Sequence, residues 1–474
     1  MKLYPEYKDS GVSWLGNVPE HWSVMSGRSC YREKKVPNKG MRETTVLSLS
    51  YGRIVVKPEE KLHGLVPASF ETYQVVDPGD IVIRPTDLQN DWNSFRFGLS
   101  QHRGTITSAY MCFHTRGPLD RRYGYLLLHA YDLKKVFYGL GSGLRQNLDW
   151  SDFKYLPCLV PPRDEQCAIV RFLDHQDRLI RQYIRAKQKL IGLLNEQKQA
   201  IINRAVTRGL DPNVPLKPSG IDWLGDIPEH WMRTPLRYLA DVQTGITLGK
   251  NYSGQGLEER PYLRVANVQT GRLDLNVVKT VSVPPSEIAG SELREGDVLM
   301  TEGGDIDKLG RGCVWRGEIE GCLHQNHIFA VRANQSRLLP DYLVALMASR
   351  HGRTYFELTA KRTTNLASTN SSTLRAFPLV LPAVDEQREI LKLITKSTRE
   401  LNALRDHAEC EIDLIREYRT RLIADVVTGK VDVRHLAPAP GEESADSEPE
   451  ALNEGMDDEI PGQDEPESVE EAEA

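Results

Sequence analysis

The sequence has few cysteines and lacks the short motifs that mark the commonest enzyme classes. Its seven cysteines are scattered and form no CxxC pair, which excludes a disulfide framework and disfavours a zinc site. There is no GxxxxGKS/T loop, GxSxG elbow or HExxH helix, so we expect neither a motor nor a protease of a familiar type. No apolar run approaches the roughly 18 residues of a membrane span, and the first residues lack the apolar segment of a signal peptide. We therefore expect a cytoplasmic protein without membrane contact.

Acidic and basic side chains are unevenly divided along the chain. Of 66 acidic residues, 15 lie in residues 437–474, where there is no lysine or arginine, so residues 1–436 carry 60 basic against 51 acidic side chains, a net charge of +9. A basic body can face nucleic acid. Residues 437–474 are rich in Pro, Glu, Ser, Ala and Gly, and we expect a disordered acidic tail. A partner-binding or DNA-mimicking tail is the alternative.

The body of the chain is a repeat. Residues 8–22, KDSGVSWLGNVPEHW, match residues 217–231, KPSGIDWLGDIPEHW, at 10 of 15 positions with an offset of 209. A second anchor, Asp164-Glu165-Gln166, recurs as Asp385-Glu386-Gln387 with an offset of 221. The segments between the anchors differ in length by 12 residues and show little identity. The frame is thus repeated while the interior varies.

Each repeat is predicted to end in a long helix. Prolines precede Asp164 and Asp385, whose carboxylates can cap a helix start, and no further proline occurs before Gly209 and Gly429, where we expect the helices to end. Each helix would have about 45 residues and a length of roughly 67 Å. The first is basic, with 10 Lys/Arg against 5 Asp/Glu in residues 163–209, which suits phosphates, an acidic partner or a solvated face.

Apolar residues recur every seven positions in both helices, and Lys187 is the one polar member of the series. This spacing predicts a coiled-coil seam along which the two helices pack on each other, and packing of each helix on its own domain is the alternative. The apolar seam positions are Leu173, Ile180, Leu194, Ile201, Ile394, Leu401, Ala408, Ile415 and Leu422.

The parts before the helices combine short β-rich runs with amphipathic stretches, which predicts an α+β fold of mixed α/β domains. Strands are expected at residues 44–47, 80–83, 107–112 and 328–331, and an amphipathic stretch lies at 340–349. The predicted organisation is a first domain at 1–163, a long helix at 164–209, a second domain at 210–384, a long helix at 385–430 and the tail at 437–474.

Two loops are candidates for contact with nucleic acid. A glycine-rich loop at 303–312 could bring backbone N–H groups and two basic residues to a phosphate, through Gly303, Gly304, Lys308 and Arg311. The corresponding region of the first repeat carries side chains that can read base edges: Arg84, Asn90, Asn93, Arg96, Gln101 and Arg103. The alternative for the glycine-rich loop is a simple hairpin connection. The alternative for the region of the first repeat is a solvated loop. His324 and His327 lack a placed third ligand, so no metal site is expected.

Taken together, these features resemble the specificity subunits of type I restriction-modification enzymes. The resemblance rests on the Pro-Glu-His-Trp segments at 19–22 and 228–231, on Gly296-Asp297-Val298-Leu299-Met300 with its glycine-rich sequel, and on the Asp-Glu-Gln openings of the two helices. It extends over nearly all of residues 8–430. The acidic tail is not part of the family's pattern.

The resemblance implies two target recognition domains that each read one half of a split sequence in double-stranded DNA, held apart by an antiparallel pair of helices. It implies a non-catalytic subunit that binds no cofactor itself. Its partners would be two modification subunits, which bind S-adenosylmethionine and methylate adenine, and ATP- and Mg-dependent restriction subunits. Two other readings of the sequence stay open at this stage: a coiled-coil adaptor that binds only proteins, and a stand-alone nuclease with an unrecognised site.

Overall fold

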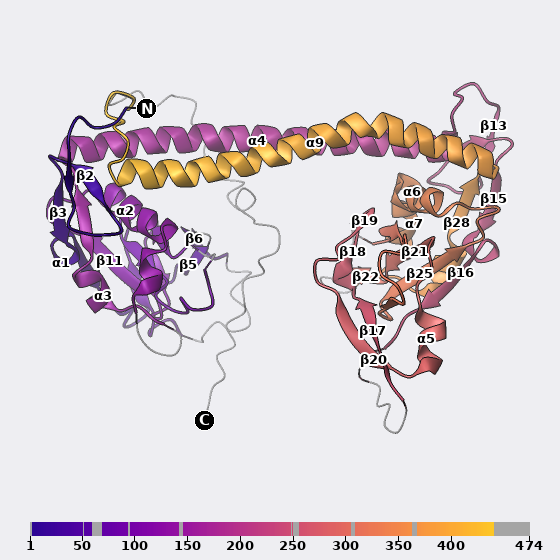
Figure 1. The fold of residues 1–474 in the computed structure, drawn as a ribbon, viewed down its shortest axis with the longest axis horizontal. Coiled ribbons are helices and arrows are strands. Elements are labelled where there is room, and N and C mark those ends of the chain that lie inside the picture. The colour runs from indigo at the N-terminus through magenta and orange to yellow at the C-terminus, as the bar shows by residue number, and fades with distance from the viewer. Residues whose placement is uncertain are drawn as a thin grey trace. The chain divides into compact units, whose positions relative to one another are not determined.

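The computed structural model describes residues 2–50, 52–58, 69–92, 95–141, 146–247, 249, 256–304, 309–362 and 367–439 (Figure 1). They form mixed α/β structure in two compact units. Unit 1 comprises Met1–Gln188 and Glu409–Ala474, and unit 2 comprises Lys189–Ala408. The predicted domain boundaries stay a prediction, and nearly all of the predicted tail lies outside the described residues. Among the described helices, none has both the length and the apolar character that a bilayer crossing requires.

Unit 1 holds the first repeat. Its elements up to the long helix α4 are β1 (Tyr7–Asp9), β2 (Asn17–Pro19), β3 (Ser23–Ser26), α1 (Gly27–Cys30), β4 (Tyr31–Lys34), β5 (Leu47–Ser50), β6 (Arg53–Val56), β7 (Gln74–Val76), β8 (Ile81–Ile83), β9 (Phe97–Leu99), β10 (Gly104–Ile106), β11 (Met111–Thr115), α2 (Arg121–Leu133), η2 (Val136–Gly139), α3 (Trp150–Lys154), β12 (Pro157–Val160) and α4 (Arg163–Arg208).

Unit 2 holds the second repeat. Its elements are β13 (Leu216–Pro218), β14 (Asp226–Pro228), β15 (Met232–Pro235), η3 (Leu236–Tyr238), β16 (Ala240–Thr244), β17 (Glu258–Leu263), η4 (Val265–Asn267), β18 (Val268–Gln269), β19 (Arg272–Leu273), β20 (Lys279–Val283), α5 (Pro285–Ser291), β21 (Asp297–Thr301), β22 (Gly303–Gly304), β23 (Gly312–Val314), β24 (Leu323–His324), β25 (Ile328–Ala333), α6 (Pro340–Ala348), α7 (Arg350–Thr359), β26 (Lys361–Arg362), β27 (Ala367–Ser368), α8 (Ser371–Ala376), β28 (Pro378–Leu381) and α9 (Val384–Val427).

Two of the expected strands begin three to four residues later than the sequence pattern suggests, and a third, β8, begins one residue later, at Ile81. The strand expected at 44–47 is β5, which begins at Leu47. The strand expected at 107–112 is β11, which begins at Met111 because the Tyr110 N–H donates to the Thr107 carbonyl and closes a turn. Local β-propensity therefore located the strands but not their starts, since turn hydrogen bonds compete for the same backbone groups.

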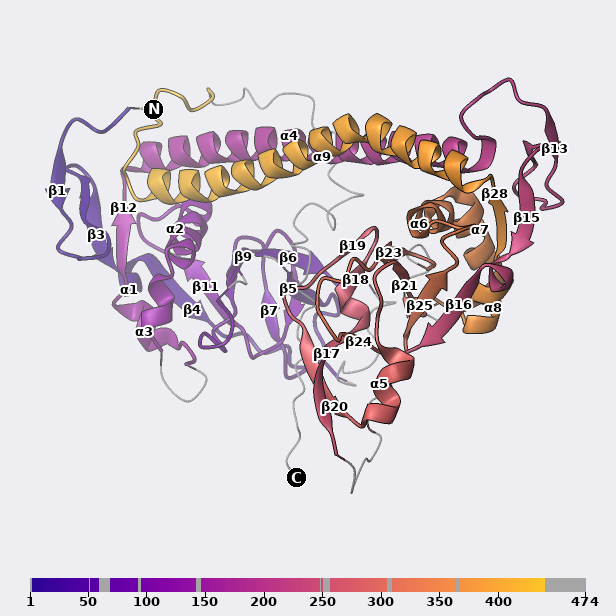
Figure 2. The same ribbon diagram turned by 45° about the vertical axis from the view of Figure 1, so that its right-hand side comes forward.

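The same four-stranded sheet lies at the centre of each unit (Figure 2). Its strand order is β4-β11-β8-β9 in unit 1 and β16-β25-β21-β23 in unit 2, and every neighbouring pair is antiparallel. The central strands β8 and β21 are buried along their whole length, which their Ile-Val-Ile and Asp-Val-Leu-Met-Thr sequences reflect. The divergent interiors of the two repeats therefore contain sheets with the same strand order and direction.

A buried aspartate opens the central strand of each sheet. Asp80 accepts from the Asp77 N–H at 2.7 Å and is bonded by Lys34, while Asp297 accepts from the Arg294 N–H at 2.8 Å. Asp297 also forms an ion pair with Arg332 at 2.6 Å. A buried carboxylate must be paired, and each unit supplies a cation from another strand of the same sheet: Lys34 from β4, two strands away, and Arg332 from the adjacent β25. This explains why Gly-Asp recurs at the start of both strands.

A two-stranded ribbon leads into each long helix. Strand β3 pairs with β12 and β15 pairs with β28 in the same antiparallel register, so Ser23 lies opposite Val160 and Met232 opposite Leu381. Prolines then stop the strands, and two residues separate β12 from α4 and β28 from α9.

A glutamate in the first turn of each long helix binds the repeated His-Trp pair. In unit 1 the buried Glu165 accepts from the Trp22 indole N–H at 3.0 Å and lies 2.7 Å from His21 Nε2. The Tyr4 hydroxyl donates to the same carboxylate at 2.6 Å. In unit 2, Glu386 contacts the Trp231 indole N–H at 3.1 Å and His230 Nε2 at 2.9 Å. The Pro-Glu-His-Trp motif therefore fixes the start of a helix that lies far from it in the sequence.

The next residue of each helix, a glutamine, ties the helix start to the shorter helix of the same unit. Gln166 donates to the Pro161 carbonyl at 2.8 Å and accepts from the Asp120 N–H at 2.7 Å, just before α2. Gln387 donates to the Pro382 carbonyl at 3.0 Å and accepts from the Leu339 N–H at 2.9 Å, just before α6. Both glutamines are buried, so each satisfies backbone groups that water does not reach.

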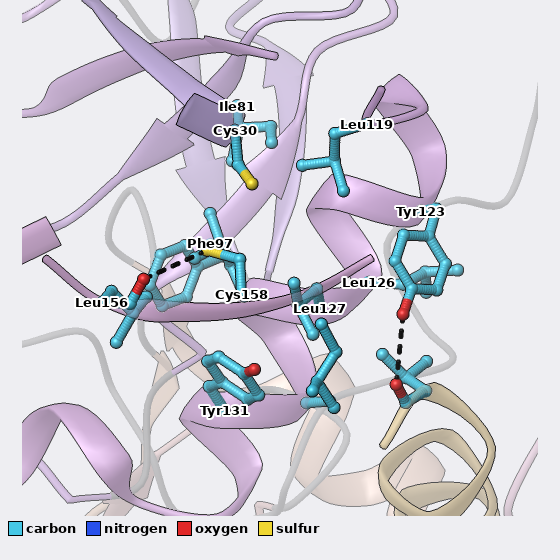
Figure 3. Packing of buried hydrophobic residues seen from close by; sticks show 14 of the residues in the cluster. Cys30, Ile81, Phe97, Leu119, Tyr123, Leu126, Leu127, Tyr131, Leu156 and Cys158 are labelled. Atoms are coloured by element: carbon cyan, nitrogen blue, oxygen red, sulfur yellow. Dashed lines mark hydrogen bonds between the residues drawn. The ribbon is translucent and has the colours of Figure 1, made fainter. Parts of the chain in front are cut away.

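The far end of the other long helix meets the same tryptophan. Helix α9 ends at Val427, just before Gly429, whose φ of 77° is left-handed and whose added Cβ would lie 3.0 Å from the Trp22 ring. Gly209, with φ of 74°, lies against Trp231 in the same way. Because only glycine tolerates both the φ and the contact, these residues end the helices at the tryptophans. The Tyr123 hydroxyl donates to the Val427 carbonyl at 3.3 Å, and both residues belong to the core cluster that includes Cys30 and Cys158 (Figure 3).

Within unit 1, α4 and α9 are joined by polar contacts beside their apolar faces. Asp177 forms an ion pair with Arg419 at 2.6 Å, and Lys187 forms one with Glu411 at 2.5 Å, so the two helices run in opposite directions there. Within unit 2, Lys198 Nζ donates to the Asn402 side chain at 2.8 Å. Of the predicted seam residues, Leu173, Ile180, Leu194, Ala408 and Leu422 are buried and the other four are half-buried.

The glutamate of α9 provides a test of this arrangement. Glu386→Ala should lower the free energy of unfolding by about 1 to 3 kcal/mol, because the buried Trp231 N–H loses its acceptor. Glu389→Ala, on the next turn, removes only an exposed ion pair with Lys392 and should change stability by less than about 0.5 kcal/mol. Urea unfolding followed by circular dichroism measures both, and equal losses in the two variants would contradict a specific role for Glu386.

Candidate nucleic-acid interface

One buried arginine organises the loop that follows β8 in unit 1. Arg96 has no exposed surface. Its Nε donates to the Tyr138 hydroxyl at 3.2 Å, and its other donors reach four backbone carbonyls of the loop, those of Arg84, Thr86, Asp87 and Asp91, at 2.6 to 3.4 Å. All five guanidinium N–H groups therefore have acceptors. The sequence analysis predicted a DNA contact for Arg96, whereas in the structure its donors are all bonded within the protein. It holds the loop at 84–91 in shape.

The loop carries an exposed tryptophan that the sequence analysis missed. Trp92 is 52% exposed, and its ring lies 4.5 Å from that of Tyr138 at an interplanar angle of 30°. Lys135 Nζ lies 4.7 Å from the Tyr138 ring centroid and donates to the Trp92 carbonyl. We call Trp92, Lys135 and Tyr138 the Trp92 surface. An exposed ring beside a cation suits stacking on bases or packing on sugars next to phosphate.

The other predicted residues of the first repeat divide into two groups. Arg84 and Asn90 belong to the same loop as Trp92, where Arg84 pairs with Asp91 at 3.3 Å and Asn90 donates to Asp87 Oδ1 at 2.8 Å. Arg103, at the far end of β9, instead bridges Asp77 and Glu43. Gln101 is exposed, and Asn93 lies outside the described residues.

Around Arg103, several charges are already paired. Although burial alone would lower it, the pKa of Lys34 is raised by its hydrogen bonds to Asp77 and Asp80. The hydrogen bond from Lys34 in turn lowers the pKa of Asp77. Arg103 is therefore held over a network of mostly paired charges, whereas Lys135 contacts a backbone carbonyl and an aromatic ring. The Trp92 loop is the stronger candidate for a DNA contact.

In unit 2 the predicted glycines lie on a small sheet with two basic residues. Strand β22, Gly303–Gly304, pairs with β27, which pairs with β26, Lys361–Arg362. Lys361 and Arg362 are both exposed, and the sequence analysis missed them although they form a basic pair beside a serine- and threonine-rich stretch. Arg311 is half-buried, and Lys308 lies outside the described residues. Gly303 and Gly304 are thus joined through β27 to a strand that carries two exposed basic residues, and the predicted phosphate contact of the loop stays a prediction.

The histidine pair does not form a metal site in the described structure. His324 is buried with its Nδ1 at 2.9 Å from the Ser291 carbonyl, while His327 is exposed and pairs with Glu302 at 2.6 Å. Throughout the described ranges, no three histidine, cysteine or acidic residues gather as a metal ion would need.

Comparison with known proteins gives the same family as the sequence resemblance. No protein-family model matches the chain. The chain is 26% identical over 174 residues to the putative type I restriction enzyme MjaX specificity subunit of Methanocaldococcus jannaschii, across 36% of this chain and 40% of that protein. It is 23% identical over 314 residues to the type I restriction enzyme EcoKI specificity subunit of Escherichia coli, across 63% of this chain and 64% of that protein. Its curated homologues are type I restriction enzyme specificity subunits.

These matches have clear limits. The chain spans less than two thirds of the length of either of these curated specificity subunits. Among solved structures, a chain from a study of complex assembly and conformational transition of the type I R-M system matches with a TM-score of 0.59 at 14% identity, over 87% of this chain and 99% of that one. This likeness shows the fold, and the activity and partners of the whole protein are argued below.

Removing the buried arginine tests how the loop is held. Arg96→Lys should lower the free energy of unfolding by about 2 kcal/mol or more, because one ammonium group cannot satisfy four carbonyls and a hydroxyl that are shielded from water. Arg103→Lys, which alters only exposed ion pairs, should cost less than about 1 kcal/mol. Urea denaturation compares them, and a neutral Arg96→Lys variant would show that Arg96 does not support the loop.

Two titratable residues of α2 behind this loop are shifted in opposite directions. Burial raises the pKa of Asp132 to about 6, although the Arg96 N–H donates to it at 3.0 Å. Burial, together with the charges of Arg419 and Arg122, lowers the pKa of His129 to about 4. The folded state therefore holds the Asp132 proton more tightly, and the His129 proton less tightly, than the unfolded chain.

Single substitutions should expose these opposed effects on stability. Between about pH 4 and pH 6 the contribution of Asp132 falls as pH rises, while that of His129 rises, by about 2 kcal/mol each. Asp132→Asn should therefore make stability rise more steeply with pH, and His129→Gln should make it fall relative to wild type. Urea midpoints at pH 4.5 and 6.0 measure the slopes. Identical slopes in all three proteins would contradict the assignment.

Proposed function

We propose that this chain is the DNA sequence-recognition subunit of a type I restriction-modification complex. In this proposal it carries out no chemistry and binds no cofactor itself. It reads a bipartite, asymmetric sequence in double-stranded DNA and positions the enzymatic subunits there. The similarity of the chain to curated type I restriction enzyme specificity subunits supports this role.

The observation that carries the proposal is that one repeated frame supports two different surfaces. Both units share the sheet order, the ribbon register and the Glu-His-Trp contact. On that frame, unit 1 presents the Trp92 surface, whereas unit 2 presents the basic hairpin of Lys361 and Arg362. Different surfaces on the same frame suit two half-sites of different sequence, because base readout depends on side chains and positioning depends on the frame.

The long helices would join the two target recognition domains as an antiparallel coiled coil. The predicted seam residues support this arrangement. So do the ion pairs of Asp177 with Arg419 and of Lys187 with Glu411, which show that the helices are antiparallel within unit 1. The repeated frame would offer two equivalent docking surfaces to two modification subunits, which would bind S-adenosylmethionine. Restriction subunits would supply the ATP- and Mg-dependent steps.

Exchange of one recognition domain tests the proposal. Residues 1–163 are replaced by the corresponding domain of another specificity subunit, and the protein is produced with its modification and restriction subunits. Methylome sequencing should then show one half of the methylated motif changed and the other retained. The reciprocal exchange of residues 210–384 is the matched control and should change the other half. An unchanged motif in both exchanges would overturn the proposal.

A further inference from the structure

The two repeats keep an arginine at the same place outside the recognition loops. Arg28 follows β3 in unit 1, and Arg237, which is 209 residues later, follows β15 in unit 2. Each lies against an exposed tyrosine ring. Arg28 Cζ is 6.0 Å from the ring centroid of Tyr155, which is 66% exposed, and Arg237 Cζ is 5.0 Å from that of Tyr238, which is 65% exposed.

A second basic residue accompanies each arginine. Lys154, in α3, lies with its Nζ 5.4 Å from the Tyr155 ring centroid. Arg375, in α8, occupies the equivalent position 221 residues later. The neighbouring backbones are in direct contact in both units. An added Cβ at Gly27 would lie 1.9 Å from the Phe153 carbonyl oxygen, and the Leu236 N–H donates to the Phe377 carbonyl at 2.9 Å.

We call Arg28, Lys154 and Tyr155 the first patch, and Arg237, Tyr238 and Arg375 the second patch. The tyrosine comes from a different position in each. Ser29 stands where the second repeat has Tyr238, and Ala376 stands where the first has Tyr155. The cation-and-ring surface is therefore present in both units although the ring has changed its place in the chain. A cation–π pair at an exposed site contributes only about 0.5 to 1 kcal/mol, so stability alone gives little reason for this coincidence.

The charge of the patches is available to a partner. Within the described residues, Arg28, Lys154 and Arg237 have ring contacts but form no ion pair with a carboxylate. Arg375 donates to the Val242 carbonyl, which leaves its charge uncompensated by that bond. The first patch thus has two cations at one exposed ring, and the second has Arg237 at the Tyr238 ring with Arg375 on the neighbouring helix α8.

We propose that the two patches are equivalent docking points for two copies of one protein subunit that presents a carboxylate beside an apolar surface. This rests on the proposed function, in which two modification subunits bind the repeated frame. A partner identical at both sites explains why the same chemistry occurs on units whose recognition loops differ. Arginine and tyrosine are the residue types that most often carry the binding energy of protein interfaces, since their planar groups bury a large area at small entropic cost.

The phosphate backbone of DNA, which is also the same at both half-sites, fits the patches less well. Phosphate contacts require several extended cations, and duplex binding proteins commonly make 6 to 10 of them, roughly three or more times what one patch offers. The exposed tyrosine rings would gain little from a phosphate oxygen. A carboxylate set in an apolar protein surface would use both the guanidinium and the ring.

Charge reversal at each arginine tests the proposal in the assembled complex. Full-length chain carrying Arg28→Glu, Arg237→Glu or both is produced with its modification subunits, and native mass spectrometry counts the copies bound. Each single variant should weaken one of the two sites by about 30-fold or more and leave one copy in place, and the double variant should lose both. Tyr155→Ala should weaken the site that Arg28→Glu weakens, and Tyr238→Ala should weaken the site that Arg237→Glu weakens. Arg353→Glu, exposed on α7 and outside both patches, is the matched control and should bind two copies.

The outcomes separate this inference from the proposed function. Two copies bound by the double variant, with unchanged affinity, would overturn the inference while leaving sequence recognition intact. Retained stoichiometry with weaker and less salt-dependent binding to non-target duplex would assign the patches to the DNA backbone instead, and would also overturn it. A wild-type complex that methylates no split sequence would refute the proposed function, whatever the copy number. A variant counts as correctly folded when its circular dichroism spectrum and its urea unfolding midpoint match those of the wild-type protein.

Discussion

The bond between a buried carboxylate and an indole N–H holds each half of this protein together. Glu165 and Glu386 lie in the first turn of a long helix, and each binds the tryptophan and the histidine of a motif far away in the sequence. The same tryptophan contacts the glycine that ends the other long helix of its unit. One polar contact therefore aligns a helix start, a helix end and the ribbon leading to the central sheet. Because Glu165 has three polar partners and Glu386 has two, the contact fixes direction as well as proximity.

This frame separates what must be constant from what varies. The buried aspartates at the start of β8 and β21 are each paired with a cation from another strand of the same sheet, so both central strands begin at a paired carboxylate. Past that point the chains differ. The loop at 84–91 is shaped by a single internal arginine, whereas the second unit uses a short three-stranded sheet. Loops supported on so rigid a base can change sequence without disturbing the fold.

The sequence allowed the repeat and the helix starts to be found because both depend on local chemistry. Prolines, an aspartate and a closing glycine mark α4 and α9 within one or two residues. The burial of Arg96 and its role in holding the loop could not be predicted in this way. Its partners are backbone carbonyls, which leave no trace in residue identity, and its sequence context of Asn and Arg is also that of a base-reading loop. The exposure of Trp92 was not predicted either, because a single tryptophan in a sequence is usually buried in the core.

Lys187 interrupts the apolar heptads of α4, and within unit 1 its partner is Glu411, which also accepts from Tyr183. A polar residue at such a position costs stability but has one correctly placed partner. If the helices slipped by one heptad, Lys187 would face the level of Leu404 or Tyr418 and would lose the carboxylate. The ion pair between Lys187 and Glu411 therefore fixes the register of the two helices at this point. A length measured along the paired helices then has one value, because no other register keeps this contact.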